Sequence, residues 1–332
     1  MAWSTTSNRP VRMATLVALL LTGLGHAQTP RLFESVEAHM GTLMRIQLYA
    51  PNAAAARRAF RAAFDRIAVL DAELTDYQDT SELSRLSREA IGRPVRISED
   101  LFRVLEASRQ ISEETAGAFD ITLGPLTHLW RAARKSNRVP EPAAVRAALA
   151  SCGYQKLHLN RQDRTALLDQ PGMQLDAGGI AKGFAADEAL AVLERMGVHS
   201  ALVAASGDLA FSGAPPGTAG WKIGIAAPVG YLVRSNGAVS TSGAAEQHLD
   251  AGGMRFSHII DPRTGLGLTQ GLTVTVTARR GIRADAASTA ISVLGVERGM
   301  AWVERQADLA ALVTEGDGRT HASACFKDWI AP

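Results

Sequence analysis

Cysteine is nearly absent from this chain of 332 residues, which contains only Cys152 and Cys325. Neither a CxxC pair nor a cysteine–histidine spacing typical of zinc sites occurs. In an oxidising compartment the two cysteines would form a disulfide only if their Cα atoms lay within bonding distance, which a sequence does not establish. We therefore expect two free thiols.

Familiar catalytic motifs are missing as well. The sequence has no GxGxxG fingerprint after a strand, no GxxxxGK(S/T) phosphate loop, no HExxH zinc motif and no GxSxG nucleophile elbow. The common nucleotide-binding and hydrolase machineries therefore lack support, and any chemistry must come from other residues.

No excess of charge of one sign marks the body of the chain. The formal net charge is +2, and Arg9 and Arg12 account for it, because the first 27 residues contain no acid. The remainder balances 33 basic residues against 33 acidic ones, so nucleic acid is not expected as a partner. Hydrophobic residues make up 46% of the chain, which is enough for a sizeable core.

The N-terminus has the pattern of a secretion signal. Arg9 and Arg12 precede an apolar run at residues 13–25 that is too short to span a bilayer comfortably. Gly25 and Ala27 supply the small residues of a cleavage site, which predicts a signal peptide over residues 1–27. An uncleaved anchor is the alternative. No cysteine lies nearby, so a lipid anchor is not supported.

Apolar spacing predicts both helices and strands. Helices are expected at residues 53–74, 98–117, 180–197, 284–294 and 296–306. Strands are expected at 44–50, 201–205, 221–226, 256–260 and 272–278, with a short strand ending at Asp176 and hairpins at 156–169 and around 316–318. Regular βαβ alternation is missing, so the pattern indicates an α+β fold of mixed sheets flanked by helices. Without repeats or a long linker, residues 28–332 are expected to form one domain with two lobes.

The segment at residues 175–187 (LDAGGIAKGFAAD) joins a strand to a helix. Gly178 and Gly179 allow close approach of the backbone, and a helix start offers unpaired N–H groups to an anion. Lys182 adds a positive charge suited to phosphate. The same glycine pair also fits ordinary structural packing, so this segment alone does not establish a phosphate site.

Two further segments carry candidate catalytic and metal-binding groups. His258 lies in a strand-like run within residues 256–265, and histidine acts as a base near neutral pH, although a structural role is commoner. Asp285 and Thr289 are four residues apart, so on a helix they share one face and offer hard oxygen donors to Mg²⁺. Ordinary polar residues near a helix start would explain the same pair. Residues 239–243 (VSTSG) indicate a polar loop or a plain turn.

In their order along the chain, these segments resemble the motifs of the FAD:protein FMN transferase family, also called the ApbE family. The resemblance covers about residues 40–299. Its seven segments are MGT at 40–42, SELSRL at 81–86, AFDITLGPL at 118–126 followed by Trp130, LDAGGIAKGFAAD at 175–187, TSG at 241–243, SHIIDPRTG at 257–265 and ADAAST at 284–289. Ser87 and Ser206 depart from the family pattern, which has asparagine and glycine at these places.

The resemblance implies a T-fold-like domain and a set of site residues. Mg²⁺ would be held by the backbone carbonyl of Ala181 together with Asp285 and Thr289, and His258 would be the catalytic base. The implied flavin-binding residues are Met40, Tyr77, Ala118, Phe119, Asp120, Asp176, Gly178, Lys182, Ile259 and Ile260.

Three functions are compatible with these residues. The resemblance favours transfer of the FMN part of FAD to a threonine or serine of an acceptor flavoprotein, with release of AMP. The acceptor would be exported or membrane-bound, in a bacterial periplasm. With water as the nucleophile, the same metal and base would hydrolyse FAD to FMN and AMP. An exported flavin-binding protein without turnover is the third possibility, and the histidine argues against it because binding alone needs no base.

Overall fold

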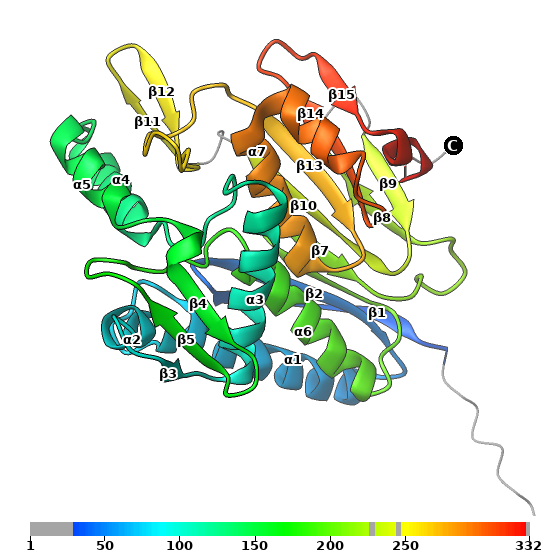
Figure 1. Cartoon of the computed structure of the whole chain (residues 1–332). Coiled ribbons are helices and arrows are strands. Elements are labelled where there is room, and N and C mark those ends of the chain that lie inside the picture. The colour runs from blue at the N-terminus through cyan, green and yellow to red at the C-terminus, as the bar shows by residue number, and fades with distance from the viewer. Residues whose placement is uncertain (1–28, 226–229, 244–246, 330–332) are drawn as a thin grey trace, which may run out of the picture.

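Eight strands form the main sheet of the computed structural model, which describes residues 29–225, 230–243 and 247–329 (Figure 1). Each neighbouring pair in the sheet is antiparallel. In sheet order the strands are β1 (Arg31–His39), β2 (Thr42–Ala50), β6 (Ala201–Ala205), β7 (Asp208–Phe211), β10 (Gly237–Gly243), β13 (Thr273–Ala278), β14 (Leu309–Thr314) and β15 (Thr320–Ala322).

Three helices cover one face of this sheet, namely α1 (Ala53–Leu74), α6 (Ala181–Arg195) and α7 (Gly281–Val303), and α3 (Glu99–Glu114) packs against α1 and α7. Because side chains alternate along a strand, Met44, Ile46 and Leu48 of β2 all point toward the helices and are fully buried. Val274 and Val276 do the same from β13. The main core therefore lies between the sheet and these helices.

The opposite face of the sheet is covered by a separate, smaller apolar cluster. Leu202 and Leu312 project from the sheet into this cluster, where they meet Trp221 and Phe326. The covering elements are the hairpin of β8 (Trp221–Gly224) and β9 (Tyr231–Arg234) and the 3-10 helix η2 (Ala324–Trp329). Both faces of the central strands are thus removed from water.

A second lobe packs around Trp130. Its elements are α4 (Gly124–Ser136), α5 (Pro142–Ala150), β11 (His248–Ala251) and β12 (Met254–Ser257). The Trp130 ring lies 5.4 Å from that of Phe256, and its indole N–H donates to the carbonyl of Gly265 at 2.8 Å. This tryptophan therefore fixes the hairpin that precedes His258 against α4.

The remaining elements form a small outer layer. They are α2 (Glu82–Glu89), the short 3-10 helix η1 (Tyr154–Lys156) and a three-stranded sheet of β3 (Val95–Arg96), β5 (Thr165–Leu168) and β4 (Leu157–Asn160). Asn160 pairs with Thr165, which confirms the hairpin predicted at residues 156–169.

Several sequence predictions are confirmed and several are wrong in detail. Residues 53–74 form α1 as predicted, and the side chain of Ser98 caps α3 by accepting the N–H of Leu101 at 3.1 Å. The predicted helices at 284–294 and 296–306 form α7, which runs through Gly295 although this residue has non-helical backbone angles. The strand predicted to end at Asp176 is only an isolated bridge between Leu123 and Gln174. Cys152 and Cys325 are both free.

Two predictions reach beyond the described residues, and a third extends past the end of its strand. The signal peptide at residues 1–27 lies outside them, as does Ala226, the end of a predicted strand that stops at Gly224. The strand predicted at 256–260 ends at Ser257.

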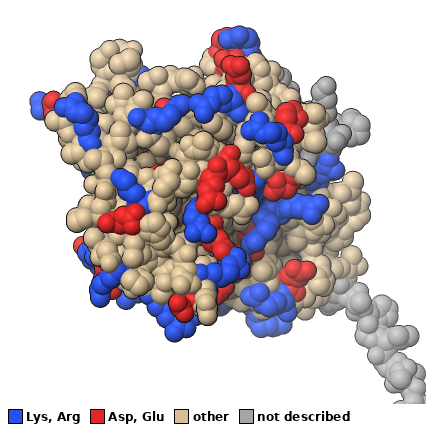
Figure 2. All heavy atoms as spheres, viewed as in Figure 1, with Lys and Arg blue, Asp and Glu red and all other residues tan. Residues whose placement is uncertain are grey.

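In the described part of the chain, no helix is long and apolar enough to cross a bilayer. Basic and acidic side chains are interspersed on the face shown in Figure 2.

The helices α6 and α7 cross at a pair of glycines, Gly183 and Gly281. A Cβ atom on Gly183 would lie 2.1 Å from the carbonyl oxygen of Gly281, and one on Gly281 would lie 2.4 Å from the carbonyl oxygen of Gly183. The crossing is further fixed by Asp187, whose carboxylate accepts the N–H groups of Gly281 and Ile282 at 2.6 and 3.1 Å. Asp187 therefore caps α7 from the neighbouring helix.

Replacing Gly183 with alanine is expected to lower the free energy of unfolding by about 1–3 kcal/mol, because the added methyl must push the two backbones apart. Denaturant titration followed by circular dichroism measures the change. Gly224→Ala is the matched control, since nothing lies within 4 Å of a Cβ there. Equal stability of the two variants would contradict the close crossing.

Candidate functional site

The loop at residues 176–180 leads into α6 and forms one wall of the candidate site. The Asp176 carboxylate accepts the N–H of Gly178 at 2.7 Å, and the Asp176 N–H donates to the carbonyl of Ile121 at 2.8 Å. The preceding residue, Leu175, donates its N–H to the hydroxyl of Ser87 at 3.1 Å. The loop is thus held on both sides, and a buried serine does this where the family pattern has asparagine.

Lys182, in the first turn of α6, lies between two buried carboxylates. Its Nζ is 2.5 Å from Oδ2 of Asp208 and 3.7 Å from Oδ2 of Asp285. Oδ1 of Asp208 also accepts the hydroxyl of Ser240 at 2.6 Å, and Oδ2 of Asp285 accepts the N–H of Gly183 at 3.0 Å. The start of β7, the middle of β10 and the start of α7 therefore meet at α6.

These carboxylates and the ammonium group shift each other's ionisation. Burial would lower the pKa of Lys182, but the charges of Asp285 and Asp208 outweigh it and raise that pKa above the usual value. Burial, reinforced by the charge of Asp208, raises the pKa of Asp285 to about 7, against the opposing charge of Lys182. Two acids beside one base leave this cluster with an excess of negative charge when all three groups are ionised.

Thr289 lies one helical turn beyond Asp285 and faces the same loop. A Cβ atom at Gly179 would lie 3.1 Å from Oγ1 of Thr289 and 3.3 Å from the ring of Phe119. Asp285 contacts the backbone of Gly183. The structure therefore brings both predicted side-chain ligands of the metal to residues 179–183, the segment that contains Ala181, and Phe119 lies beside them.

The other implied flavin residues lie around this loop and in the second lobe. Ala118 and Ile259 share a small apolar cluster with Val293 of α7, and Ile260 packs in the cluster around Trp130. The ring of Tyr77 is 75% exposed and lies against the guanidinium of a nearby arginine, as described below.

Two implied residues have clear structural roles. Met40 occupies the two-residue turn between β1 and β2 with φ 51°, and its N–H donates to Asp71 at 2.7 Å. Oδ1 of Asp120 accepts the N–H and the hydroxyl of Thr122 within its own turn at 2.8 and 2.6 Å, and Oδ2 accepts the N–H of the distant Tyr154 at 2.9 Å. Their contact with a flavin stays a prediction.

His258 lies one residue beyond the end of β12, so its predicted place within a strand is wrong. The N–H of His258 still donates to the carbonyl of Gln247 at 3.0 Å, but the N–H of Ile259 turns back to the Ser257 hydroxyl at 3.1 Å. Nδ1 of His258 is 3.2 Å from the carbonyl oxygen of Gln247, which can only accept, so Nδ1 carries the hydrogen of this bond. In the neutral ring, Nε2 is then the basic nitrogen.

Ser206 departs from the family pattern in the turn between β6 and β7. It has φ 58°, a left-handed conformation that costs a non-glycine residue about 1 kcal/mol. The side chain is exposed, and the turn delivers Asp208 to Lys182. The substitution therefore preserves the position of the carboxylate that contacts the site lysine.

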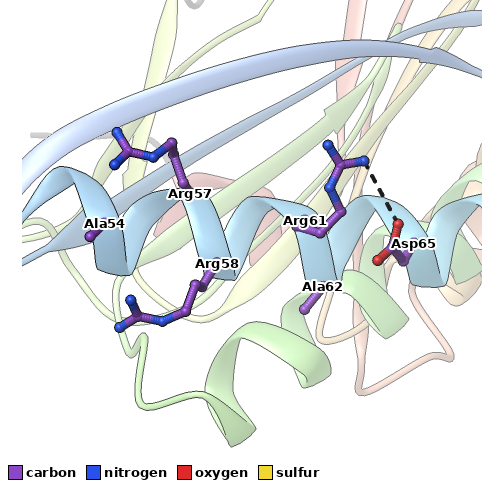
Figure 3. Close-up of a pocket in the computed structure, with 6 residues that line it drawn as sticks. All are labelled: Ala54, Arg57, Arg58, Arg61, Ala62 and Asp65. Carbon is purple, nitrogen blue, oxygen red and sulfur yellow. Dashed lines mark ion pairs between the residues drawn. The ribbon is translucent and has the colours of Figure 1, made fainter.

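A shallow hollow on the outer face of α1 is separate from this site (Figure 3). It is lined by Ala54, Arg57, Arg58, Arg61, Ala62 and Asp65, and none of these is a predicted site residue.

Comparison with known proteins agrees with this arrangement. The sequence matches the ApbE family over residues 40–313. The chain belongs to the ApbE family. An FAD:protein FMN transferase of Treponema pallidum is 33% identical to it over 343 residues, which cover 96% of this chain and 95% of the relative. A solved flavin transferase ApbE from Vibrio cholerae is 28% identical with a TM-score of 0.82, covering 90% of this chain and 99% of the other.

Membership of the ApbE family does not by itself point to Arg131, which the sequence analysis missed. This arginine on α4 contacts Asp76 and Asp176, which lie 55 and 45 residues away. Its partners are distant in sequence, and the neighbouring residues of α4 show only the pattern of an amphipathic helix. No local pattern therefore singles out Arg131. Asp208 was missed as a partner of Lys182 for the same reason.

Proposed function

We propose that this chain transfers the FMN part of FAD to a threonine or serine hydroxyl of an acceptor flavoprotein and releases AMP. The acceptor oxygen forms a bond to the FMN phosphorus, the bond from that phosphorus to the bridging oxygen breaks, and that oxygen leaves with AMP. The observation that carries the proposal is the convergence of Asp285 and Thr289 on the loop at residues 176–183, in a chain with the family's motifs.

The residues at this junction fit a magnesium ion. The Asp285 carboxylate, the Thr289 hydroxyl and the Ala181 carbonyl are hard oxygen donors, which Mg²⁺ prefers. Burial raises the pKa of Asp285 in spite of the opposing charge of Lys182, and a bound cation would further favour the ionised carboxylate. Within the described residues, no group of three or more histidine, cysteine, aspartate or glutamate side chains is placed to hold a metal. A magnesium ion bound here would neutralise charge on the diphosphate.

The chain's own residues have distinct parts in this reaction. The Lys182 ammonium lies at the same junction, where it offsets part of the negative charge of Asp208 and Asp285 that the diphosphate would otherwise meet. His258 accepts the proton of the acceptor hydroxyl at Nε2, while its bond to Gln247 holds the ring. Phe119 lies beside Gly179 of the loop, and together with Tyr77 and Ile259 it would supply apolar surface for the flavin.

The experiment that tests this function is a transfer assay on the purified mature protein. With FAD, Mg²⁺ and a folded acceptor domain, we expect a mass spectrum in which the acceptor gains one FMN. Replacement of the acceptor's reactive hydroxyl residue by alanine is the control and should prevent the gain. Accumulation of free FMN with an unmodified acceptor would identify the chain as an FAD hydrolase. Recovery of unchanged FAD would indicate a protein that binds flavin without turnover.

We further propose that the protein acts after export, on an exported or membrane-bound acceptor. The support is the pattern of residues 1–27, with two arginines, a short apolar run and small residues before the cleavage site. The N-terminal sequence of the protein recovered from a periplasmic fraction would test cleavage after Ala27.

A further inference from the structure

Arg131 of α4 connects two segments of the chain that are 100 residues apart. One guanidinium nitrogen contacts Oδ2 of Asp76, and another lies 2.9 Å from Oδ2 of Asp176. The side chains of Asp76 and Asp176 are only 8% and 9% exposed. His128, also on α4, reaches the same oxygen of Asp76 at 3.0 Å. The arginine fork is therefore fixed from two sides by partly desolvated carboxylates, the geometry in which such bonds are strongest.

The fixed guanidinium supports an exposed aromatic ring. The Cζ atom of Arg131 lies 4.3 Å from the centre of the Tyr77 ring, a distance typical of cation–π contact. Tyr77 is nevertheless 75% exposed, so its ring is not part of the apolar core. An aromatic ring that is held on one side and left in solvent on the other presents a flat surface against which a planar ligand can stack.

The two contacts of Arg131 have different consequences for the site. Asp76 precedes Tyr77 directly, so the first contact sets the position of the ring-bearing segment. Asp176 begins the loop that leads to Lys182, so the second contact sets the position of the loop that faces the diphosphate. One side chain therefore fixes the distance between an aromatic surface and a phosphate-binding loop.

We infer that Arg131 is a positioning residue that aligns the Tyr77 ring with the loop at residues 176–182, so that the planar ring of a bound flavin dinucleotide and its diphosphate are engaged together. This inference rests on the proposed function. Arg131 itself need not contact the ligand, because it acts through Tyr77 and Asp176.

Equilibrium binding of FAD, followed by quenching of flavin fluorescence, tests this role without requiring turnover. We expect Arg131→Gln to weaken FAD binding about tenfold. Lys135→Gln removes a positive charge from an exposed side chain of the same helix and should change binding by less than about twofold. Arg131→Lys keeps the charge but loses the fork, so binding should be intermediate. Thermal unfolding of each variant shows whether it folds, and Arg131→Lys carries the test if Arg131→Gln does not.

A double substitution separates positioning from a general effect on the fold. In a Tyr77→Ala background, Arg131→Gln should weaken FAD binding by clearly less than tenfold, because the ring that it positions is gone. The same tenfold loss with and without Tyr77, or an equal loss from Lys135→Gln, would overturn the inference. If the unmodified protein fails to bind FAD, the proposed function fails instead, which distinguishes the two results.

Discussion

Asp285→Asn is expected to lower the rate of magnesium-dependent FMN transfer by about 10³-fold. Asp285 is the one charged side chain among the proposed metal ligands, and it is buried at the crossing of α6 and α7. Asparagine has nearly the same shape, and its carbonyl oxygen can still accept the N–H of Gly183. The substitution therefore removes the negative charge while keeping the helix crossing, which alanine would not do.

The measurement is the transfer rate as a function of Mg²⁺ concentration, with thermal unfolding in parallel. Asp187→Asn is the matched control, because Asp187 is another acid of the same helix pair but contacts only the start of α7. We expect this control to lose stability and to retain a magnesium-dependent rate within about tenfold of the unmodified protein. An Asp285→Asn variant with the normal rate and the normal magnesium response would exclude Asp285 as a metal ligand.

The parts of the fold that the sequence predicts well are those with local causes. Residues 53–74 have apolar side chains at helical spacing, which gives α1 one apolar face to pack against the core. Residues 239–243 (VSTSG) are small and mostly polar, so the prediction of a loop or turn there is wrong, and they belong to strand β10. It is buried because it lies between β7 and β13, where Ser240 bonds to Asp208 and Ser288 at 2.6 and 3.0 Å. Only the assembled sheet supplies these partners.

The residues of the candidate site also divide into those that local sequence patterns reveal and those that only contacts between distant residues reveal. Motif order points to Lys182, Asp285 and Thr289 as candidate site residues, because they lie in short segments that resemble family motifs. The contacts that hold Lys182 and the loop before it come from Asp208 and Arg131, whose partners are at least 26 residues away in sequence. A single sequence contains no signal for such pairs, since nothing in the local pattern records which distant carboxylate an arginine or lysine will meet.

His258→Ala is expected to slow FMN transfer by about 10²–10⁴-fold while FAD still binds with nearly normal affinity. The reason is that a neutral hydroxyl is a poor nucleophile until a base takes its proton, whereas in the proposed site the loop before Lys182 and apolar contacts would hold FAD. His248→Ala is the matched control, because His248 pairs with Ser257 across the same hairpin and is not one of the proposed site residues.

Two rates measured on this variant show whether His258 acts on the acceptor hydroxyl alone or also on water. Transfer to the acceptor and slow release of free FMN are measured together by mass spectrometry and chromatography. If both rates fall by the same factor, His258 takes the proton from either nucleophile, the acceptor hydroxyl or water. The acceptor then determines the product by excluding water. If only transfer to protein falls, His258 is matched to the acceptor side chain. An undiminished transfer rate would mean that another group takes the proton, and the bond between His258 and Gln247 would then be structural.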